Sequence, residues 1–439
     1  MEATMNIGYI GLGALGGQLA RRFLRDHRLA VWDIDTTAAR KLADEGASVA
    51  PTAMELAQRS DVVFLCLPRS ADVRNVVFAP DGLAAGLAPG KLVVDQTSGV
   101  PDETREIATA LSQIGVLMMD AAVSASPQIV PTGNANLMVS GPDDVLARGK
   151  PALRAITENI FRCGSRVGDG QAMKTVNNAM NAGCRLGTLE ILAFGRKAGL
   201  TLEQMAERFA NSEARCQITE RMLPALMQGK ASTDFALSLM LKDVYQALSL
   251  GMKHGSPMPI TSVVHGLLQI GGNLHGPGAR LEDMVNIIAS MAATSITSSP
   301  NPSVSVPDER RPDEILTALT SIVSSQCRAV SYECIAAGLD YGLQLEDMAE
   351  VLHGSSGWST ASRNIFRELI ERQHPDPMSI GEATRHLQEG CSYAGRIGAP
   401  LMIANEARSI LELMQRQFGS TRHVDELSIL YPAVARRVT

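Results

Sequence analysis

A glycine-rich loop close to the beginning of the sequence constrains the fold more than any other feature. In YIGLGALGGQLARRFL, Gly11, Gly13 and Gly16 have G-x-G-x-x-G spacing, directly after a strand-like apolar run and at the start of a helical pattern. The first glycine allows a tight turn, the second lets the backbone approach a pyrophosphate, and the third lets helix and strand pack closely. The N-terminus of the helix offers free N–H groups and a positive dipole end to phosphates. The pattern predicts a dinucleotide-binding loop made of Gly11, Leu12, Gly13, Ala14, Leu15 and Gly16.

The first third of the chain alternates strand-like runs with helical patterns. The strand-like runs are MNIGYIG, RLAVWDI, VVFLCL, KLVVDQ, VLMMDAAV and NLMVSG, and periodic segments such as Leu15–Arg25 and Thr36–Glu45 lie between them. Such alternation predicts a parallel sheet with helices on both faces. From about Ala172 the pattern changes to long helices. We therefore expect an α/β domain of the Rossmann type followed by all-α domains.

An acidic residue at the end of the second strand-like run indicates which dinucleotide binds. Asp33 follows Gly16 by seventeen positions, where its carboxylate could accept both ribose hydroxyls of NAD and repel a 2′-phosphate. Asp35 is the alternative acid, although its position suits an N-cap for a helix that begins at Thr36. Ile34 stands where an arginine would favour NADP. NAD is expected in preference to NADP, and the alternative is a domain of this fold that binds no nucleotide.

A second motif, GDGQAMKTVNNAMNAG, contains one lysine and three asparagines. Lys174, Asn177, Asn178 and Asn181 stand at i, i+3, i+4 and i+7, so they share one stripe of a helix beside an apolar stripe. Oxidation of an alcohol by NAD needs a base for the hydroxyl proton, and a partly buried lysine can serve. The alternative is a lysine that extends to solvent beside asparagines that bond to neighbouring helices.

With these motifs the chain resembles the β-hydroxyacid dehydrogenase family, which includes 3-hydroxyisobutyrate, tartronate semialdehyde and 6-phosphogluconate enzymes. The resemblance lies in GYIGLGALGG, DAAVSASPQIVPTGNANLMVSG and VGDGQAMKTVNN, and covers the Rossmann domain and the first helical part. It implies hydride transfer between NAD and a 3-hydroxy acid, or the matching semialdehyde or keto acid. It also implies that Lys174 is the general acid/base, that Asn178 orients the substrate and that Asn177 contacts it.

The substrate block departs from the family pattern. The family usually reads D-A-P-V-S-G-G, and this chain reads D-A-A-V-S-A-S from Asp120 to Ser126. The resemblance implies that Ser124 binds substrate, with Ala125 and Ser126 as neighbouring contacts that keep the N–H groups but disfavour positive φ. We expect a substrate other than a simple small acid. The alternative is that Ser124 only ends a strand.

Shorter matches imply further contacts. CLPRSAD resembles the family's turn on the nicotinamide ribose side, and DQTSG resembles a segment of cofactor contacts. LMLKDV resembles a late pair in which Lys242 closes over cofactor and substrate with support from Asp243. The alternatives are an ordinary turn at the strand end and a surface ion pair. The implied cofactor contacts are Leu67, Pro68, Asp72, Thr97, Ser98 and Lys242, and Lys242 is also an implied substrate contact.

The helical part repeats itself at a constant offset, which carries Cys184 onto Cys327. CRLGTLEILAFGRKAGLTLEQMAE recurs as CRAVSYECIAAGLDYGLQLEDMAE, and HGSPMPI recurs as IGAPLMI. At this repeat offset Lys174 falls on Thr317, so the second copy lacks the lysine. We expect a non-catalytic copy that is structural, walls the site or takes the place of a partner subunit; a further homodimer remains open.

These observations divide the chain into a NAD-binding domain at 1–166, a first helical copy at 167–294, a Ser- and Pro-rich linker at 295–312 and a second copy at 313–439.

Composition narrows the function classes. A net charge of −6 without a basic block argues against nucleic acid, and no apolar run suits a bilayer. Seven scattered cysteines are expected to be reduced and buried, and no metal-ligand spacing occurs, so no metal site is expected. The N-terminus lacks a basic signal segment, so we expect a cytoplasmic enzyme. The expected partner is a small-molecule carboxylate substrate.

Three other functions remain open. An imine reductase would share the fold, but such relatives usually replace the lysine by Asp or Tyr. A 6-phosphogluconate enzyme would need an arginine-bearing phosphate block, and none is clear in the sequence. The third alternative, from another class, is a dinucleotide-binding sensor or scaffold without turnover.

Overall fold

The computed structural model describes residues 4–297, 311–373 and 377–438. The chain divides into two compact units, Met1–Lys174 and Thr175–Thr439. Most of the expected linker, residues 298–310, lies outside the described residues.

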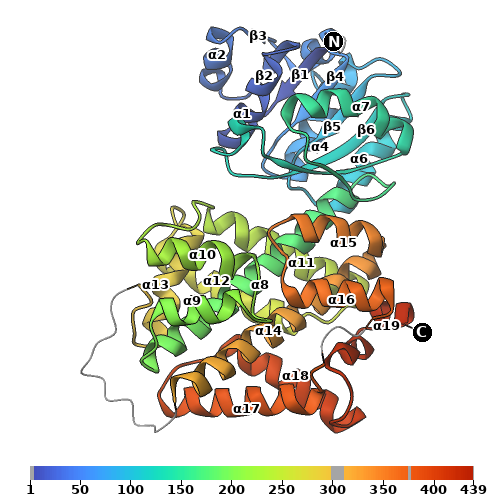
Figure 1. Cartoon of the computed structure of the whole chain (residues 1–439). Helices are drawn as coiled ribbons and strands as arrows, with labels where there is room; N and C mark the ends of the chain where they lie inside the picture. The colour runs from blue at the N-terminus through green and yellow to red at the C-terminus, as the bar shows by residue number, and fades with distance from the viewer. Residues whose placement is uncertain (1–3, 298–310, 374–376, 439) are drawn as a thin grey trace. The chain divides into compact units, whose positions relative to one another are not determined.

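The first unit contains an eight-stranded sheet with the order β3-β2-β1-β4-β5-β6-β7-β8 (Figure 1). Each of the six strand-like runs of the sequence contains a strand, whereas β3 and β8 are too short to show an apolar pattern. The strand order reverses between β1 and β4, which is where sheets of this type bind ligands, at the carboxyl ends of the strands. The strands are β1 (Asn6–Ile10), β2 (Arg28–Trp32), β3 (Ser48–Val49), β4 (Val62–Leu65), β5 (Leu92–Asp95), β6 (Leu117–Ser124), β7 (Asn136–Ser140) and β8 (Ile160–Arg162).

Helices cover both faces of this sheet, as the alternating pattern predicted (Figure 1). Successive strand side chains point to opposite faces, so Val62 and Phe64 of β4 join one core while Val63 and Leu65 join the other. The first core contains α1, α2 and α7, and the second contains α3, α4, α5 and α6. The helices are α1 (Ala14–Phe23), α2 (Thr36–Asp44), α3 (Ala53–Arg59), α4 (Ser70–Phe78), α5 (Leu83–Gly86), α6 (Pro101–Ser112), η1 (Val130–Thr132) and α7 (Asp143–Ile156).

Two strands depart from the expected parallel sheet, because β8 pairs parallel with β7 and so also runs opposite to the strands before it. Strand β7 runs antiparallel to β6, with Ser124 opposite Asn136. A parallel pair needs a crossover of a dozen or more residues, usually a helix. Residues 125–135 hold only the short η1, so the chain turns back along β6.

The second unit is helical, and its helices occur in two equivalent sets. The repeat offset of the sequence carries the first residues of α8, α9, α10, α11 and α12 onto the first residues of α14, α15, α16, α17 and α18. The elements are α8 (Asp169–Lys197, which begins in the first unit), α9 (Leu202–Ala210), α10 (Gln217–Met227), α11 (Leu237–His254), α12 (Pro259–His275), η2 (Leu281–Asp283), α13 (Met284–Met291), α14 (Pro312–Tyr341), α15 (Leu345–Gly354), α16 (Thr360–Glu371), α17 (Ile380–Arg396), α18 (Met402–Phe418), η3 (Val424–Leu430) and α19 (Pro432–Val438).

Equivalent contacts recur in both sets. The ion pair between Arg185 and Glu282 has its counterpart in the buried pair of Arg328 and Asp425. Cys216 forms a β-bridge with Ser359, which is its own equivalent at the repeat offset. A residue that pairs with its own equivalent lies beside a two-fold axis. The two sets are therefore related by a pseudo-two-fold axis.

The two sets also hold one another reciprocally. The carboxylate of Glu190 accepts hydrogen bonds from the N–H groups of Met402 (2.8 Å) and Ile403 (3.0 Å) at the start of α18. Its equivalent, Glu333, accepts from Ile260 (2.7 Å) and from the next residue at the start of α12. Helix N-termini favour such carboxylates. Burial nevertheless raises the pKa of Glu190 to about 7 and that of Glu333 to about 8.

Two further features concern both units. No helix within the described residues is long and apolar enough to cross a membrane. All seven cysteines lie in described segments; none is in a disulfide, and all except the half-buried Cys66 are buried.

Candidate functional site

The glycine loop has the geometry that the sequence predicted. Gly11 has a φ of +93°, and a Cβ atom there would lie 2.2 Å from the carbonyl oxygen of Cys66. A Cβ atom on Gly16 would lie 2.0 Å from the carbonyl oxygen of Gly11. At Gly13, the N-cap of α1, no atom of the described chain lies within 4 Å of a Cβ position. The loop thus has an open side at the N-terminus of α1, which fits a pyrophosphate group.

The two candidate acids have different contacts. Asp33 accepts hydrogen bonds from the N–H groups of Leu12 (2.6 Å, Oδ2) and Asp35 (2.8 Å, Oδ1), so its carboxylate lies against the glycine loop. Each carboxylate oxygen can accept a further hydrogen bond. Asp35 is the N-cap of α2 and accepts from the N–H of Thr37 at 2.9 Å. Asp35 has the capping contact that its position suggested, and Asp33 is the better placed acid for a ribose.

Two of the expected cofactor contacts are engaged within the protein. The hydroxyl of Thr97 is buried and accepts from the N–H of Leu67 at 3.1 Å, so it holds the turn that contains Leu67 and Pro68. Asp72 forms two hydrogen bonds with Arg69, at 3.0 and 3.1 Å, in an ion pair at the surface. Thr97 and Asp72 thus each have a structural contact within the protein, and their roles in cofactor binding stay predictions.

Lys174 and Ser98 are brought together by the fold. The ammonium group of Lys174, which is half-buried, donates a hydrogen bond to Ser98 Oγ in the loop after β5. The thiol of Cys66, at the end of β4, lies close enough for the charge of Lys174 to affect it, although burial raises the pKa of that thiol to about 11. The expected acid/base and one expected cofactor contact are therefore neighbours.

Two buried carboxylates that sequence reasoning did not assign to the site hold the start of α8. Asp120 accepts from the N–H groups of Gly168 (2.7 Å) and Gln171 (2.9 Å), and also from the hydroxyl of Ser140. Asp95 is its partner in the register of β5 and β6. Burial raises the pKa of Asp95 to about 6 and that of Asp120 to about 7. The sequence held a signal for buried carboxylates, because Asp95 ends and Asp120 interrupts an otherwise apolar strand run.

The side chain of Gln171 links these elements. Its Nε2 donates to Asp95 Oδ2 (3.2 Å) and to the carbonyl oxygen of Thr97 (3.0 Å), and its Oε1 accepts from the hydroxyl of Thr104 (2.8 Å). Lys174 follows three residues later on the same helix. The network therefore fixes the first turn of α8 against the strand ends and places the lysine.

Further along α8, Asn178 contacts α11 and Asn177 contacts Asn178. Asn178 donates from Nδ2 to Asp243 Oδ2 at 2.7 Å, and Lys242 Nζ lies 3.6 Å from Asp243 Oδ1. Asn177 is fully buried, and its Nδ2 donates to Asn178 Oδ1 (3.2 Å) and to Ser356 Oγ (3.0 Å). Asn177 is thus held between Asn178 and Ser356, and the direct contact with substrate that the resemblance implied stays a prediction.

The substrate block ends β6. Ser124 is its last residue, and Ser124, Ala125 and Ser126 are all half-buried. Among the described residues, only Ala293 and Arg372 have positive φ without being glycine. The block therefore keeps negative φ at both positions where the family has glycine, as expected from the substitution.

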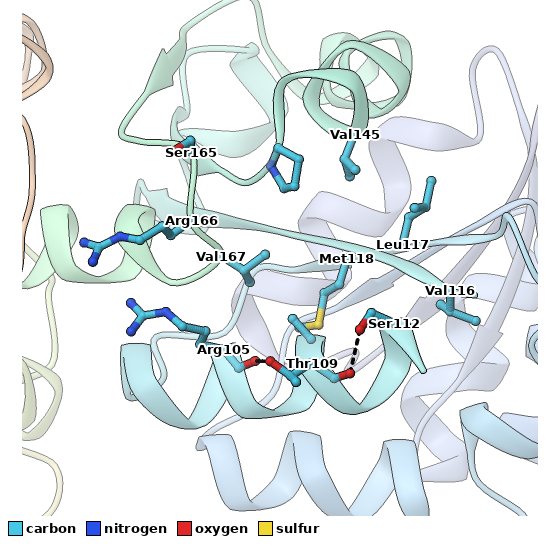
Figure 2. A pocket seen from close by; sticks show the side chains of 12 residues that line it. Arg105, Thr109, Ser112, Val116, Leu117, Met118, Val145, Ser165, Arg166 and Val167 are labelled. Atoms are coloured by element: carbon cyan, nitrogen blue, oxygen red, sulfur yellow. Dashed lines mark hydrogen bonds between the residues drawn. The ribbon is translucent and has the colours of Figure 1, made fainter. Parts of the chain in front are cut away.

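A cavity of about 320 Å³ lies elsewhere in the first unit, among α6, β6 and the segment before α8 (Figure 2). Its two arginines are both paired: Arg105 donates to Asp102 at 3.1 Å, and Arg166 lies 2.9 Å from Asp169. The cavity includes none of the expected site residues.

Comparison with known proteins places these features in a family. Residues 6–164 match the NAD binding domain of 6-phosphogluconate dehydrogenase. The domain described as the NAD-binding domain of NADP-dependent 3-hydroxyisobutyrate dehydrogenase matches twice, at residues 168–291 and 316–431. The two matches correspond to the two equivalent sets of helices.

Several similar proteins are dehydrogenases. The 2-(hydroxymethyl)glutarate dehydrogenase of Eubacterium barkeri is 32% identical over 292 residues, which are 66% of this chain and 95% of that protein. The NAD-dependent L-serine dehydrogenase of Pseudomonas aeruginosa is 33% identical, over 60% of this chain and 91% of that protein. The solved 3-hydroxyisobutyrate dehydrogenase of Mycobacterium tuberculosis has a TM-score of 0.61 at 24% identity, over 65% of this chain and 99% of that one, and shows the shared fold.

A Rossmann sheet with a glycine loop, followed by helices that carry a lysine motif, defines an NAD-binding oxidoreductase. This chain belongs to the β-hydroxyacid dehydrogenase family. The fold, the family and the NAD cofactor that the sequence predicted are confirmed.

Proposed function

We propose that Lys174 is the general acid/base of this hydroxyacid dehydrogenase. The observation that carries the proposal is its placement beside Ser98 by the buried network of Asp95, Asp120 and Gln171. When bound, NAD supplies the hydride acceptor. Lys174 would take the hydroxyl proton as the substrate is oxidised and return it in the opposite direction.

The remaining residues would bind and orient. Asn178 would orient the substrate hydroxyl or carboxylate. Its hydrogen bonds to described residues use one amide hydrogen and one lone pair of the oxygen, so the second hydrogen and the second lone pair remain for substrate. Ser124 and the N–H groups of Ala125 and Ser126 would hold the carboxylate. Lys242, beside Asp243, would add a positive charge.

The glycine loop and Asp33 would hold the cofactor. Gly13 offers the open approach to the pyrophosphate, and the carboxylate of Asp33 would accept the ribose hydroxyls. A 2′-phosphate would meet that negative charge without an arginine at Ile34, which is 88% exposed. We therefore propose that NAD is preferred to NADP.

We propose a substrate with a hydroxymethyl group one carbon from a carboxylate. Relatives are named for 2-(hydroxymethyl)glutarate, 3-hydroxyisobutyrate and L-serine, which all have that arrangement. Turnover tests it: NADH formation is measured across such acids and across sugar acids, with wild type beside Lys174→Ala. Loss of turnover only in the variant supports the proposal, whereas equal rates would refute the role of Lys174. Binding of NAD without turnover of any acid would favour the sensor.

We further propose the domain division 1–166, 167–294, 295–312 and 313–439, with a non-catalytic second copy that replaces a partner subunit's helical domain. Thr317 stands at the position of Lys174, and His386, at the position of Asp243, bonds instead to Ser321 (2.9 Å). Reciprocal contacts of Glu190 and Glu333 support the replacement.

The cytoplasmic location and the homo-oligomer that the sequence suggested are also proposals. Thiols without disulfides are typical of reducing compartments. Met252 and Leu274, which are 70% and 68% exposed on α11 and α12, offer apolar surface for a second chain. Sedimentation of the full chain would measure the oligomeric state, and fractionation of cells would locate the protein.

A further inference from the structure

We propose that the second helical copy positions the substrate-orienting Asn178, acting through Ser356, Gly357 and Asn177. The inference rests on the proposed function, in which Asn178 contacts substrate. It assigns to the copy without the lysine a positioning role for a residue of the first copy.

The contact joins α8 to the loop between α15 and α16. Asn177 Nδ2 donates to Ser356 Oγ at 3.0 Å, and the N–H of Gly357 donates to Asn177 Oδ1 at 2.8 Å. One turn further along α8, Asn181 Nδ2 donates to the carbonyl oxygen of Ser356 at 2.8 Å. Two asparagines of the lysine motif are therefore held by two adjacent residues of the second copy.

The close approach depends on a glycine. A Cβ atom on Gly357 would lie 2.9 Å from both the backbone oxygen and Oδ1 of Asn177. These are backbone and hydrogen-bonded atoms that cannot move aside cheaply. The loop is thus fitted to α8 at Asn177.

These contacts fix the orientation of one amide. The N–H of Gly357 can only donate, so the oxygen of Asn177 must face the glycine, and its nitrogen then faces Ser356 Oγ, a hydroxyl that accepts. The second Nδ2 hydrogen of Asn177 then points to Asn178 Oδ1, at 3.2 Å. A rotated amide would place Oδ1 of Asn177 against Oδ1 of Asn178.

The chain of contacts continues to α11. The oxygen of Asn178 accepts from Asn177, and its Nδ2 donates to Asp243 Oδ2 at 2.7 Å. Lys242 Nζ lies 3.6 Å from the other carboxylate oxygen, Asp243 Oδ1. Asn178 is therefore held from both sides, by the second copy through Asn177 and by α11 through Asp243. Ser356 is a positioning residue at the end of this chain.

The arrangement belongs to the lysine-bearing copy. At the repeat offset, Asn177 corresponds to Thr320, whose hydroxyl donates to the carbonyl oxygen of Leu316 in its own helix, at 2.8 Å. The equivalent position in the second copy thus has a local contact, although the overall pairing is pseudo-symmetric.

Kinetics of Ser356→Ala, Ser356→Thr and Asn177→Ala in the full chain test the inference. A matched control is Ser379→Ala, which removes the N-cap of α17 in the same copy and leaves the contacts of Ser356, Asn177 and Asn178 intact. Ser356→Ala should lower kcat/KM for the hydroxyacid roughly tenfold, mainly through KM, with NAD affinity unchanged. Ser356→Thr should restore the wild-type value, and Ser379→Ala should lower only the Tm.

Coupling separates positioning from stability. Ser356→Ala combined with Asn177→Ala should be no worse than Asn177→Ala alone. If the losses in kcat/KM of the two single variants multiply in the double variant, the inference is overturned. Wild-type kinetics of Ser356→Ala would overturn it as well. If Ser356→Ala lowers the Tm more than the control does, Asn177→Asp replaces it; this variant sets an oxygen against Asn178 Oδ1 and should raise KM, and an unchanged KM would also overturn the inference. Lys174→Ala with full activity would instead refute the proposed function itself.

Discussion

Lys174 donates a hydrogen bond to Ser98, a residue 76 positions earlier in the chain. A parallel contact lies three residues before each of them, where Gln171 donates to Asp95 at 3.2 Å. Because the two contacts are three residues apart on both segments, they align the first turns of α8 with the end of β5. The position of the lysine is thus set by buried polar groups of the Rossmann unit.

Ser98→Ala should weaken catalysis without unfolding the protein. The ammonium group of Lys174 would lose an acceptor, and removal of a hydrogen bond to a charged group costs about 1.5–3 kcal/mol. We expect kcat/KM to fall roughly 10- to 100-fold by steady-state kinetics. Ser112→Ala is a control, because that hydroxyl donates to the carbonyl oxygen of Thr109 within its own helix. Equal kinetics in both variants would show that Ser98 does not support Lys174.

Asp33 should determine the choice of cofactor. Asp33→Ala removes the acceptors for the ribose and the charge that opposes a 2′-phosphate, so KM for NAD should rise about tenfold or more while the preference over NADP shrinks. The control Asp35→Ala removes the N-cap of α2 and should cost about 1 kcal/mol of stability. Its NAD-to-NADP ratio of kcat/KM should match the wild type. A changed ratio in Asp35→Ala alone would assign the ribose contact to the other acid.

Stability should fall as pH rises through the neutral range. Burial raises the pKa of Glu333 from 4.5 to about 8, so between these values the folded state holds a proton that the unfolded state releases. The stabilisation is complete below pH 4.5 and is lost as pH approaches about 8, with a slope of up to roughly 1.4 kcal/mol per pH unit. Chemical denaturation across this range should give a shallower slope for Glu333→Gln. Glu346→Gln, at an exposed position, should keep the wild-type slope, and identical slopes in all three proteins would contradict the assignment.

Arg328 should be essential for the stability of the second copy. It and Asp425 are buried, with side chains 2% and 0% exposed, so Arg328→Met leaves a buried carboxylate without its counter-ion. Such a loss costs about 3–5 kcal/mol in the free energy of unfolding. Arg59→Met breaks an exposed pair with Glu55 and should cost less than about 1 kcal/mol. A similar loss in both variants by denaturant titration would contradict this account of the buried pair.

The sequence predicted local features well and long-range polar contacts poorly. Apolar runs identified six of the strands, and the capping position of Asp35 could be inferred from its spacing to Thr36. The antiparallel direction of β7 and β8 could not be inferred, because apolar patterning does not encode strand direction.

Buried acids and contacts between the copies escaped prediction for a different reason. Asp95 and Asp120 stand within strand runs, and their partners lie as far as Gln171, so spacing alone does not connect them. Ser356 lies 179 residues from Asn177, in a copy that has lost the lysine. Its role depends on the pseudo-two-fold pairing, which only the folded chain shows.

The most direct test of the account is the turnover of Lys174→Ala, measured as NADH formation with hydroxymethyl carboxylates at saturating NAD. We predict that kcat falls by roughly two to four orders of magnitude, while the Tm and NAD affinity stay close to those of the wild type. A kcat equal to that of the wild type would contradict the role of Lys174 as the acid/base.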